Sequence, residues 1–190
     1  MSVSPADAVA ALPAWAVVSA RRAGHIARVA TLLESWAAER GVAAGETARW
    51  RRAALLHDAL RDADTAALAP HAPDGWPPKL WHGPAAAAAA ARAGESDGGV
   101  LDAIRYHSLG YSGWDEVGRF LFLADYLEPG RVHDRALLDD LAGRAPREPE
   151  LALLDVTAHR IRWLLGACRP VLRETWEFWN SLAATKGPWR

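Results

Sequence analysis

Apolar residues recur along this chain at the three- and four-residue spacing of helices, and almost no segment alternates as a half-buried strand does. The clearest stripe runs through residues 15–40, where Ile26, Val29 and Leu33 share one helical face. Gly41 follows as a suitable helix end, because glycine readily adopts the left-handed conformation found there. The pattern predicts a helical protein whose core is formed by such stripes.

Prolines, glycines and capping residues divide the rest of the chain into shorter segments. Ser4, Pro5 and Asp7 are typical of a helix start, and Pro13 limits that opening helical segment to residues 1–13. Further helices are expected at about 47–60, 84–93, 100–108, 114–128, 149–167 and 171–183, with a long irregular connection over 61–83. The expected fold is an all-α bundle with at least six helices.

Length and charge narrow the class of protein. A chain of 190 residues suits one domain with a substantial core. With 22 basic and 23 acidic residues the net charge is -1, so we expect no nucleic-acid partner and no binding to an anionic membrane. No uncharged stretch reaches the roughly 18 residues of a membrane span, and the N-terminus lacks the basic region of a signal peptide. The single cysteine, Cys168, fits a reducing compartment, and we expect a cytoplasmic protein.

Histidines and aspartates stand out against this apolar background. In "AALLHDALRD" the adjacent pair His57 and Asp58 interrupts an apolar helical run, and Asp125 lies within "FLFLADYL". Burying an unpaired carboxylate costs on the order of several kcal/mol, so such residues need a cation. Six side chains on apolar faces or at helix ends make up the candidate set: His25, His57, Asp58, His82, His107 and Asp125.

The residue types in this set indicate transition metals. Imidazole and carboxylate together suit divalent iron, manganese, zinc or cobalt, whereas calcium and magnesium prefer oxygen ligands. Six groups exceed what one four-coordinate structural zinc would use. The count therefore favours two metal ions.

Several segments also resemble a known family. A histidine, a His-Asp pair and a distant aspartate are the signature of the HD-domain metal-dependent phosphohydrolases. The chain is most similar to the YqeK-type symmetrical diadenosine tetraphosphate hydrolases, through "GHIARVATLLESWA", "AALLHDALRD", "LWHGPAAAAAA", "VLDAIRYHSLG", "FLADYLEPGR" and "CRPVLRETWEFWNSL". The resemblance covers residues 14–183, which implies a single HD domain there and leaves 184–190 as a C-terminal tail.

The resemblance implies a ligand set and a reaction. One metal would be held by His25, His57, Asp58 and Asp125, and the other by His82 and His107 with Asp58 as the bridge. Iron is the implied metal, with manganese or cobalt as alternatives. The implied reaction is symmetrical cleavage of diadenosine tetraphosphate to two ADP, through attack by a hydroxide held between the metals.

Phosphate contacts are expected from arginines. Arg61, three residues after Asp58, stands where the family has a basic residue, usually lysine, and is expected to act in catalysis and substrate binding together with Asp58. Arg131 in "EPGR" is the second candidate, and Arg28, one turn after His25, is a weaker one.

Other interpretations stay open at this point. HD domains act on many phosphoesters, so the substrate could be another nucleotide, such as a mono- or diphosphate ester. A non-catalytic nucleotide-binding module is a third interpretation, and a homodimer through the tryptophan-rich C-terminal helix is conceivable. Trp76 and Trp81 flank the irregular connection, where an adenine could stack, although most tryptophans are expected to fill gaps between helices.

Overall fold

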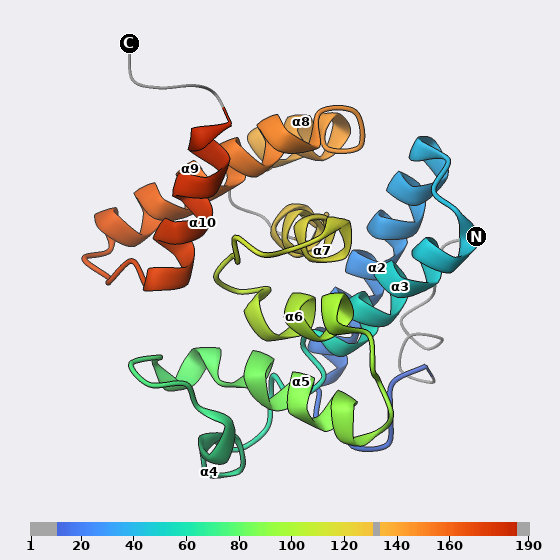
Figure 1. Cartoon of the computed structure of the whole chain (residues 1–190), viewed down its shortest axis with the longest axis vertical. Coiled ribbons are helices and arrows are strands. Elements are labelled where there is room, and N and C mark those ends of the chain that lie inside the picture. Colours follow the sequence, from blue (N-terminus) through green and yellow to red (C-terminus); the bar gives the residue numbers. More distant parts are fainter. Residues whose placement is uncertain (1–10, 131–133, 186–190) are drawn as a thin grey trace.

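The computed structural model describes residues 11–130 and 134–185. Within these ranges it contains nine α-helices, two short 3-10 helices and no strand, so the expected all-α class with at least six helices is confirmed (Figure 1). The elements are α2 (Ala20–Arg40), α3 (Ala44–Leu56), α4 (Thr65–Leu68), η1 (Ala69–His71), η2 (Pro78–Leu80), α5 (His82–Arg92), α6 (Gly98–Tyr106), α7 (Glu116–Leu127), α8 (Arg135–Arg144), α9 (Pro149–Gly166) and α10 (Arg173–Ala184).

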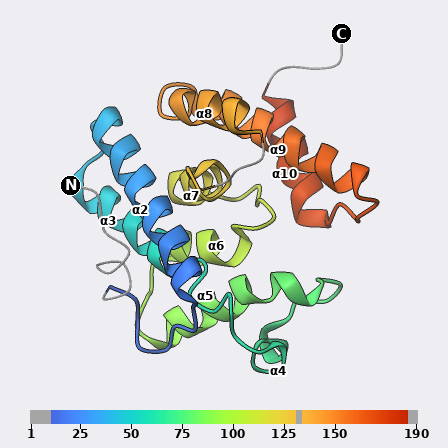
Figure 2. The ribbon, with the colours of Figure 1, turned by 180° about the vertical axis from the view of Figure 1, so that it is seen from behind.

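Helix α7 forms the centre of the molecule. It contacts α2, α3, α6, α8 and α9. Views from both sides place it near the middle, with α2 and α3 on one flank, α5 and α6 on another and α8 to α10 grouped on the remaining side (Figures 1 and 2). Its sequence is apolar on nearly every face, with Phe120, Leu121, Phe122 and Leu123 all buried, as expected for a helix surrounded by others.

The long N-terminal stripe forms helix α2, which begins later than the sequence pattern indicated. The expected start near residue 15 is wrong, because Ser19 is the N-cap and its hydroxyl accepts a hydrogen bond from the backbone N–H of Arg22. At the other end Gly41 has φ +64°, the left-handed conformation expected for a glycine C-cap. The helix therefore runs between two capping residues that the sequence supplies.

The His-Asp pair lies just beyond a helix rather than within its last turn. Helix α3 ends at Leu56, with His57 as its C-cap, so the expected end near Leu60 is wrong. The chain then tightens into turns, in which the N–H of Ala59 donates to Leu56 O at 3.1 Å and that of Arg61 to Asp58 O at 2.9 Å. These turns change the direction of the backbone at the pair.

The alanine-rich segment forms α5, and it packs closely as its small side chains indicated. It begins at His82, two residues before the expected start at Pro84. An added Cβ on Gly83 would lie 2.7 Å from the backbone oxygen of Arg105, so the helix crosses α6 almost in backbone contact. The irregular connection before it contains α4, η1 and η2.

The C-terminal part contains one helix that the sequence pattern did not indicate. Helix α8 buries only Leu138 and Leu141, too few apolar positions for a clear stripe. Helices α9 and α10 fall within about two residues of the expected bounds.

Some expectations concern residues that the structure does not describe: part of the opening segment 1–13, part of the tail 184–190, and Arg131. The domain bounds stay predictions. None of the described helices is long and apolar enough to cross a membrane.

Candidate metal centre

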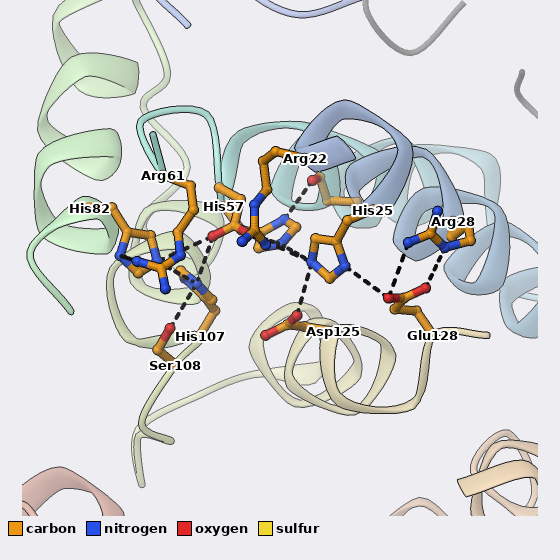
Figure 3. Close-up of polar contacts among 12 residues, drawn as sticks. Arg22, His25, Arg28, His57, Arg61, His82, His107, Ser108, Asp125 and Glu128 are labelled. Carbon is orange, nitrogen blue, oxygen red and sulfur yellow. Dashed lines mark hydrogen bonds and ion pairs between the residues drawn. The ribbon is translucent and has the colours of Figure 1, made fainter. Parts of the chain in front are cut away.

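The fold brings all six candidate side chains into one cluster. They come from α2, the turn after α3, the first residue of α5, the residue after α6, and α7. Figure 3 shows the four imidazoles in a row between the helices, with Asp125 facing His25. His25, His57, Asp58, His82 and His107 are buried, and Asp125 is partly exposed.

Backbone carbonyls fix the orientation of three of the histidines. Nδ1 of His57 lies 2.7 Å from Ala54 O, and Nδ1 of His107 lies 2.8 Å from Ile104 O. Nδ1 of His82 lies 3.0 Å from Lys79 O. A carbonyl can only accept, so each Nδ1 carries the proton and each neutral imidazole keeps its lone pair on Nε2.

Those Nε2 atoms point at one another. The Nε2 atoms of His82 and His107 are 3.1 Å apart, and those of His25 and His57 are 3.4 Å apart. In the pair of His82 and His107 both Nε2 atoms keep their lone pairs, and two facing lone pairs at this distance repel each other unless a cation lies against them. This donor arrangement fits metal ions, because metal-bound histidines commonly use one ring nitrogen and donate from the other.

Asp58 lies between the two pairs of histidines. Its Oδ1 is 3.2 Å from Nε2 of His82 and 3.4 Å from Nε2 of His107. Its Oδ2 is 3.6 Å from Nε2 of both His25 and His57. One oxygen thus faces each pair, which is the geometry that a bridging carboxylate requires.

The protonation states also suit a metal site. Burial acts to raise the pKa of Asp58, but the facing imidazoles of His57, His107 and His82 outweigh it and hold that pKa well below its usual range. Burial lowers the pKa of His57 to about 4 and also lowers the pKa of His82. At neutral pH Asp58 is therefore ionised and His57 and His82 are neutral, the forms in which these side chains bind metals.

The pKa of His25 is shifted in the opposite direction from those of His57 and His82. Burial opposes its charge, but hydrogen bonds to Asp125 and Glu128 outweigh burial and raise the pKa of His25 to about 9. A metal ion bound by Nε2 of His25 would replace the proton that Asp125 attracts to that atom.

Two groups of three residues have ligand atoms within 4.8 Å of one another: His25, His57 and Asp125, and Asp58, His82 and His107. Together they are the six residues of the expected ligand set, whereas the number of metals and the ligands of each stay predictions. The cluster could hold metal ions, and its donors fit iron, manganese, cobalt or zinc better than calcium.

Two further residues of the site carried no clear signal in the sequence. Glu128 binds Nδ1 of His25 through Oε1 at 3.1 Å, and Arg22 donates to Oδ2 of Asp58 at 2.6 Å. Arg28 donates through Nε to Oε2 of Glu128 at 2.5 Å, so its guanidinium lies beside the carboxylate that orients His25 (Figure 3).

A pocket of about 790 Å³ opens over the cluster. Asp58, His82, His107 and Asp125 line one part of it. Five cationic side chains also line it: Arg22, Arg61, Lys79, Arg160 and Arg169. Arg61 thus lines the pocket, with NH1 donating to Lys79 O at 2.8 Å, and its contact with a phosphate stays a prediction. Trp76 lines the pocket too, whereas Trp81 and Arg28 do not.

The family model of the HD domain matches residues 22–130, more than half of the chain, and this range includes all six clustered residues. The chain belongs to the HD-domain family. The resemblance read from the sequence is thus confirmed for the family, and the matched range contains the His57-Asp58 pair.

Two proteins that are similar in sequence to this chain share one name. A protein of Bacillus subtilis (strain 168) named symmetrical bis(5'-nucleosyl)-tetraphosphatase is 32% identical over 108 residues, 56% of this chain and 57% of that protein. A protein of that name from Halalkalibacterium halodurans is 29% identical over 89 residues, 47% of this chain and 46% of its own length. The chain spans less than two thirds of the length of either relative.

A solved structure has the same fold. It is described as a predicted HD superfamily hydrolase involved in NAD metabolism, from Clostridium acetobutylicum. It matches with a TM-score of 0.74 and 24% sequence identity, over 85% of this chain and 88% of that one. The likeness extends the shared fold beyond the matched HD segment to most of the chain.

Proposed function

We propose that this HD domain is a metal-dependent hydrolase that cleaves diadenosine tetraphosphate symmetrically into two ADP. The names of the two relatives support the reaction. The observation that carries the proposal is the position of the His/Asp cluster, which lies in the same pocket as five cationic side chains. A polyphosphate requires this combination, because its charge must be neutralised both at the reacting phosphorus and along the chain.

The proposed ligand roles follow the two groups of the cluster. His25, His57 and Asp125 would hold one divalent ion, His82 and His107 the other, and Asp58 would bind both. Two such ions would supply Lewis-acid activation of a phosphate and would lower the pKa of a bound water molecule. Iron as the native metal, with manganese or cobalt as alternatives, stays a prediction.

The chain's own residues would hold the reacting groups in place. The carbonyls of Ala54, Ile104 and Lys79 keep the Nε2 atoms of His57, His107 and His82 aimed at the cluster. Arg61 lines the pocket beside His82, with NH1 3.4 Å from its Nδ1, where it can meet phosphoryl oxygens. Arg22 is already bound to Asp58, so it would chiefly position that carboxylate.

Several accompanying expectations stay predictions. They are the cytoplasmic location, the absence of a nucleic-acid partner, the homodimer through the C-terminal helix and the phosphate contact by Arg131. A different nucleotide as substrate is the main alternative. The fold match to a hydrolase described as involved in NAD metabolism makes NAD a useful member of the substrate panel.

The deciding experiment measures products. The purified chain is loaded with iron(II) or manganese(II), incubated with diadenosine tetraphosphate, NAD and nucleoside mono- and diphosphates, and analysed by anion-exchange chromatography. ADP as sole product of the tetraphosphate supports the proposal, whereas AMP with ATP contradicts symmetrical cleavage. Cleavage of only another nucleotide contradicts the substrate.

Two variants test whether the measured activity belongs to this chain or to a contaminating hydrolase. His107→Ala removes one proposed ligand and should abolish turnover, whereas Arg162→Gln alters an exposed residue of α9 that does not line the pocket and should change nothing. Full turnover by His107→Ala would contradict the ligand assignment.

A further inference from the structure

We infer that Lys79, Arg169 and Trp163 form an outer subsite of the pocket, which binds the phosphates and base of the nucleotide half that lies away from the histidines. The inference rests on the proposed function for the identity of the substrate. It adds a binding site for the second nucleotide, and with it a reason why a dinucleoside polyphosphate would bind better than a mononucleotide.

The solvent exposure of the residues that line the pocket increases from a buried floor to an exposed mouth. Asp58 and His82, on the floor, are 3% and 2% exposed. Trp163 is 53% exposed, and Lys79 and Arg169 are exposed as well, although all three line the same pocket. The mouth is built from η2 and from α9 with the segment after it, whereas the two floor residues come from the turn after α3 and from the first residue of α5. A ligand that contacts both therefore has to extend from the buried floor to the exposed mouth.

The mouth carries an excess of positive charge. Among the described residues that line the pocket, the only carboxylates are Asp58 and Asp125, and both belong to the metal cluster. Arg61, Arg160 and Arg169 line the same pocket as Lys79, and their charges add to the effect of burial in lowering the pKa of Lys79, so each of them repels Lys79. A polyanion bound among them would relieve that repulsion.

An exposed aromatic ring lies beside these cations. The guanidinium carbon of Arg169 is 5.1 Å from the ring centroid of Trp163. An indole that is half exposed at a pocket mouth offers a stacking surface for a purine, and a cation against the same ring can bind the attached phosphates. The two contacts that a nucleotide needs are thus adjacent.

The division of the pocket predicts a selective effect. ADP can place its phosphates at the cluster and leave the mouth empty, whereas diadenosine tetraphosphate extends from the cluster to the mouth. Loss of the mouth residues should therefore weaken binding of the long ligand and leave ADP binding nearly unchanged. A merely structural role of these residues would weaken both ligands equally.

The test measures binding by calorimetry on the manganese-loaded protein. The ligands are ADP and the analogue of diadenosine tetraphosphate with a methylene group at the central bridge, which cannot be cleaved there. The variants are Lys79→Gln with Arg169→Gln, Trp163→Ala, and the control Arg162→Gln. Circular dichroism checks that each variant is folded.

The expected result is a Kd for the analogue raised about tenfold in each mouth variant, with the Kd for ADP within about twofold and the control unchanged, since each lost charge-assisted contact or stacked base has an effect of that order. An unchanged analogue Kd, equal weakening of both ligands, or no analogue binding by the unaltered protein would overturn the subsite. If the mouth variants selectively lose analogue binding but the unaltered protein does not cleave diadenosine tetraphosphate, the subsite is supported and the proposed reaction is rejected.

Discussion

Glu128 accepts a hydrogen bond from Nδ1 of His25 at 3.1 Å. In the described part of the chain, His25 is the one clustered histidine whose Nδ1 contacts a carboxylate. The other three Nδ1 atoms face backbone carbonyls. A carboxylate makes the histidine that it contacts more basic and a stronger metal ligand. Glu128 is itself held by Arg28 and by the backbone N–H of Gly130 at 2.7 Å, so its position is fixed from two further sides.

Replacing Glu128 by glutamine should weaken metal binding at His25. The amide keeps the size of the side chain but removes its charge, and loss of such a partner typically lowers metal affinity about 10- to 100-fold. The measurement is a manganese titration followed by calorimetry. Glu39→Gln, at an exposed position where the carboxylate pairs with Arg147, is the control. Equal affinities for Glu128→Gln and the control would show that the carboxylate does not act through His25.

Replacing Asp58 by asparagine should remove metal from both halves of the cluster. Each carboxylate oxygen faces a different pair of Nε2 atoms, at 3.2 to 3.6 Å, so this one side chain contacts both pairs. Metal content after dialysis, measured by inductively coupled plasma mass spectrometry, should fall to the background for Asp58→Asn. His107→Ala should lose the ion of its own group first. Retention of one full equivalent by Asp58→Asn would contradict the bridging role.

The sequence was sufficient to predict the His/Asp cluster because side chains of this kind are chemically conspicuous in apolar segments. Asp58 and Asp125 are carboxylates within apolar runs, and His57 adjoins one of them, so the pattern alone indicates that their burial requires a cation. Glu128 gave no such signal, since a glutamate before a proline at a helix end is ordinary on a surface. Only the approach of α7 to α2, over 103 residues of sequence, makes it a partner of His25.

Helix ends were harder to predict than helices, for a physical reason. The turn after α3 depends on the segment before α2, whose Val17 donates a backbone hydrogen bond to Ala59 O at 2.7 Å. No local pattern encodes a contact between segments about forty residues apart. Helix α8 was missed for a different reason, because it buries only Leu138 and Leu141 and its leucines are interrupted by charged residues.

Asp97 should stabilise the helix that ends next to His107, in a pH-dependent way. It caps α6 by accepting from the N–H of Val100 at 3.1 Å, and it binds Arg49 through both oxygens at 2.6 and 2.9 Å. The Arg49 hydrogen bonds, against the opposing effect of burial, lower the pKa of Asp97 to about 2 from 3.8. Because the folded-state pKa is depressed, the stabilisation is fully present above the unfolded value and is lost as the pH falls through about 2.

Two substitutions separate the cap from the ion pair. Asp97→Ala loses both and should lower the free energy of unfolding by about 1–2 kcal/mol, whereas Asp97→Asn keeps a capping oxygen and should lose less. Guanidinium denaturation at about pH 7 and about pH 3 measures this, and the Asn variant should approach the unaltered protein at the lower pH. Asp140→Asn, in an exposed pair with Arg144, is the control. A gap that stays constant with pH would contradict the role of the ion pair.

Gly83 should tolerate no side chain, because α5 crosses α6 there. A Cβ would lie 2.7 Å from Arg105 O and 3.1 Å from Ile104 O, and neither backbone atom can move without shifting a helix. The cost of such overpacking is about 1–3 kcal/mol, so Gly83→Ala should lower the midpoint of guanidinium denaturation. Gly45→Ala is the matched control, since nothing lies within 4 Å of a Cβ there and alanine in helix α3 should stabilise the protein by up to about 1 kcal/mol.

Gly83→Ala should also weaken manganese binding, because Gly83 directly follows His82 and Ile104 O holds Nδ1 of His107. Equal stability of Gly83→Ala and Gly45→Ala would mean that α5 and α6 can separate at this crossing. Unchanged manganese binding by a destabilised Gly83→Ala would mean that His82 and His107 keep their relative positions when the helices shift.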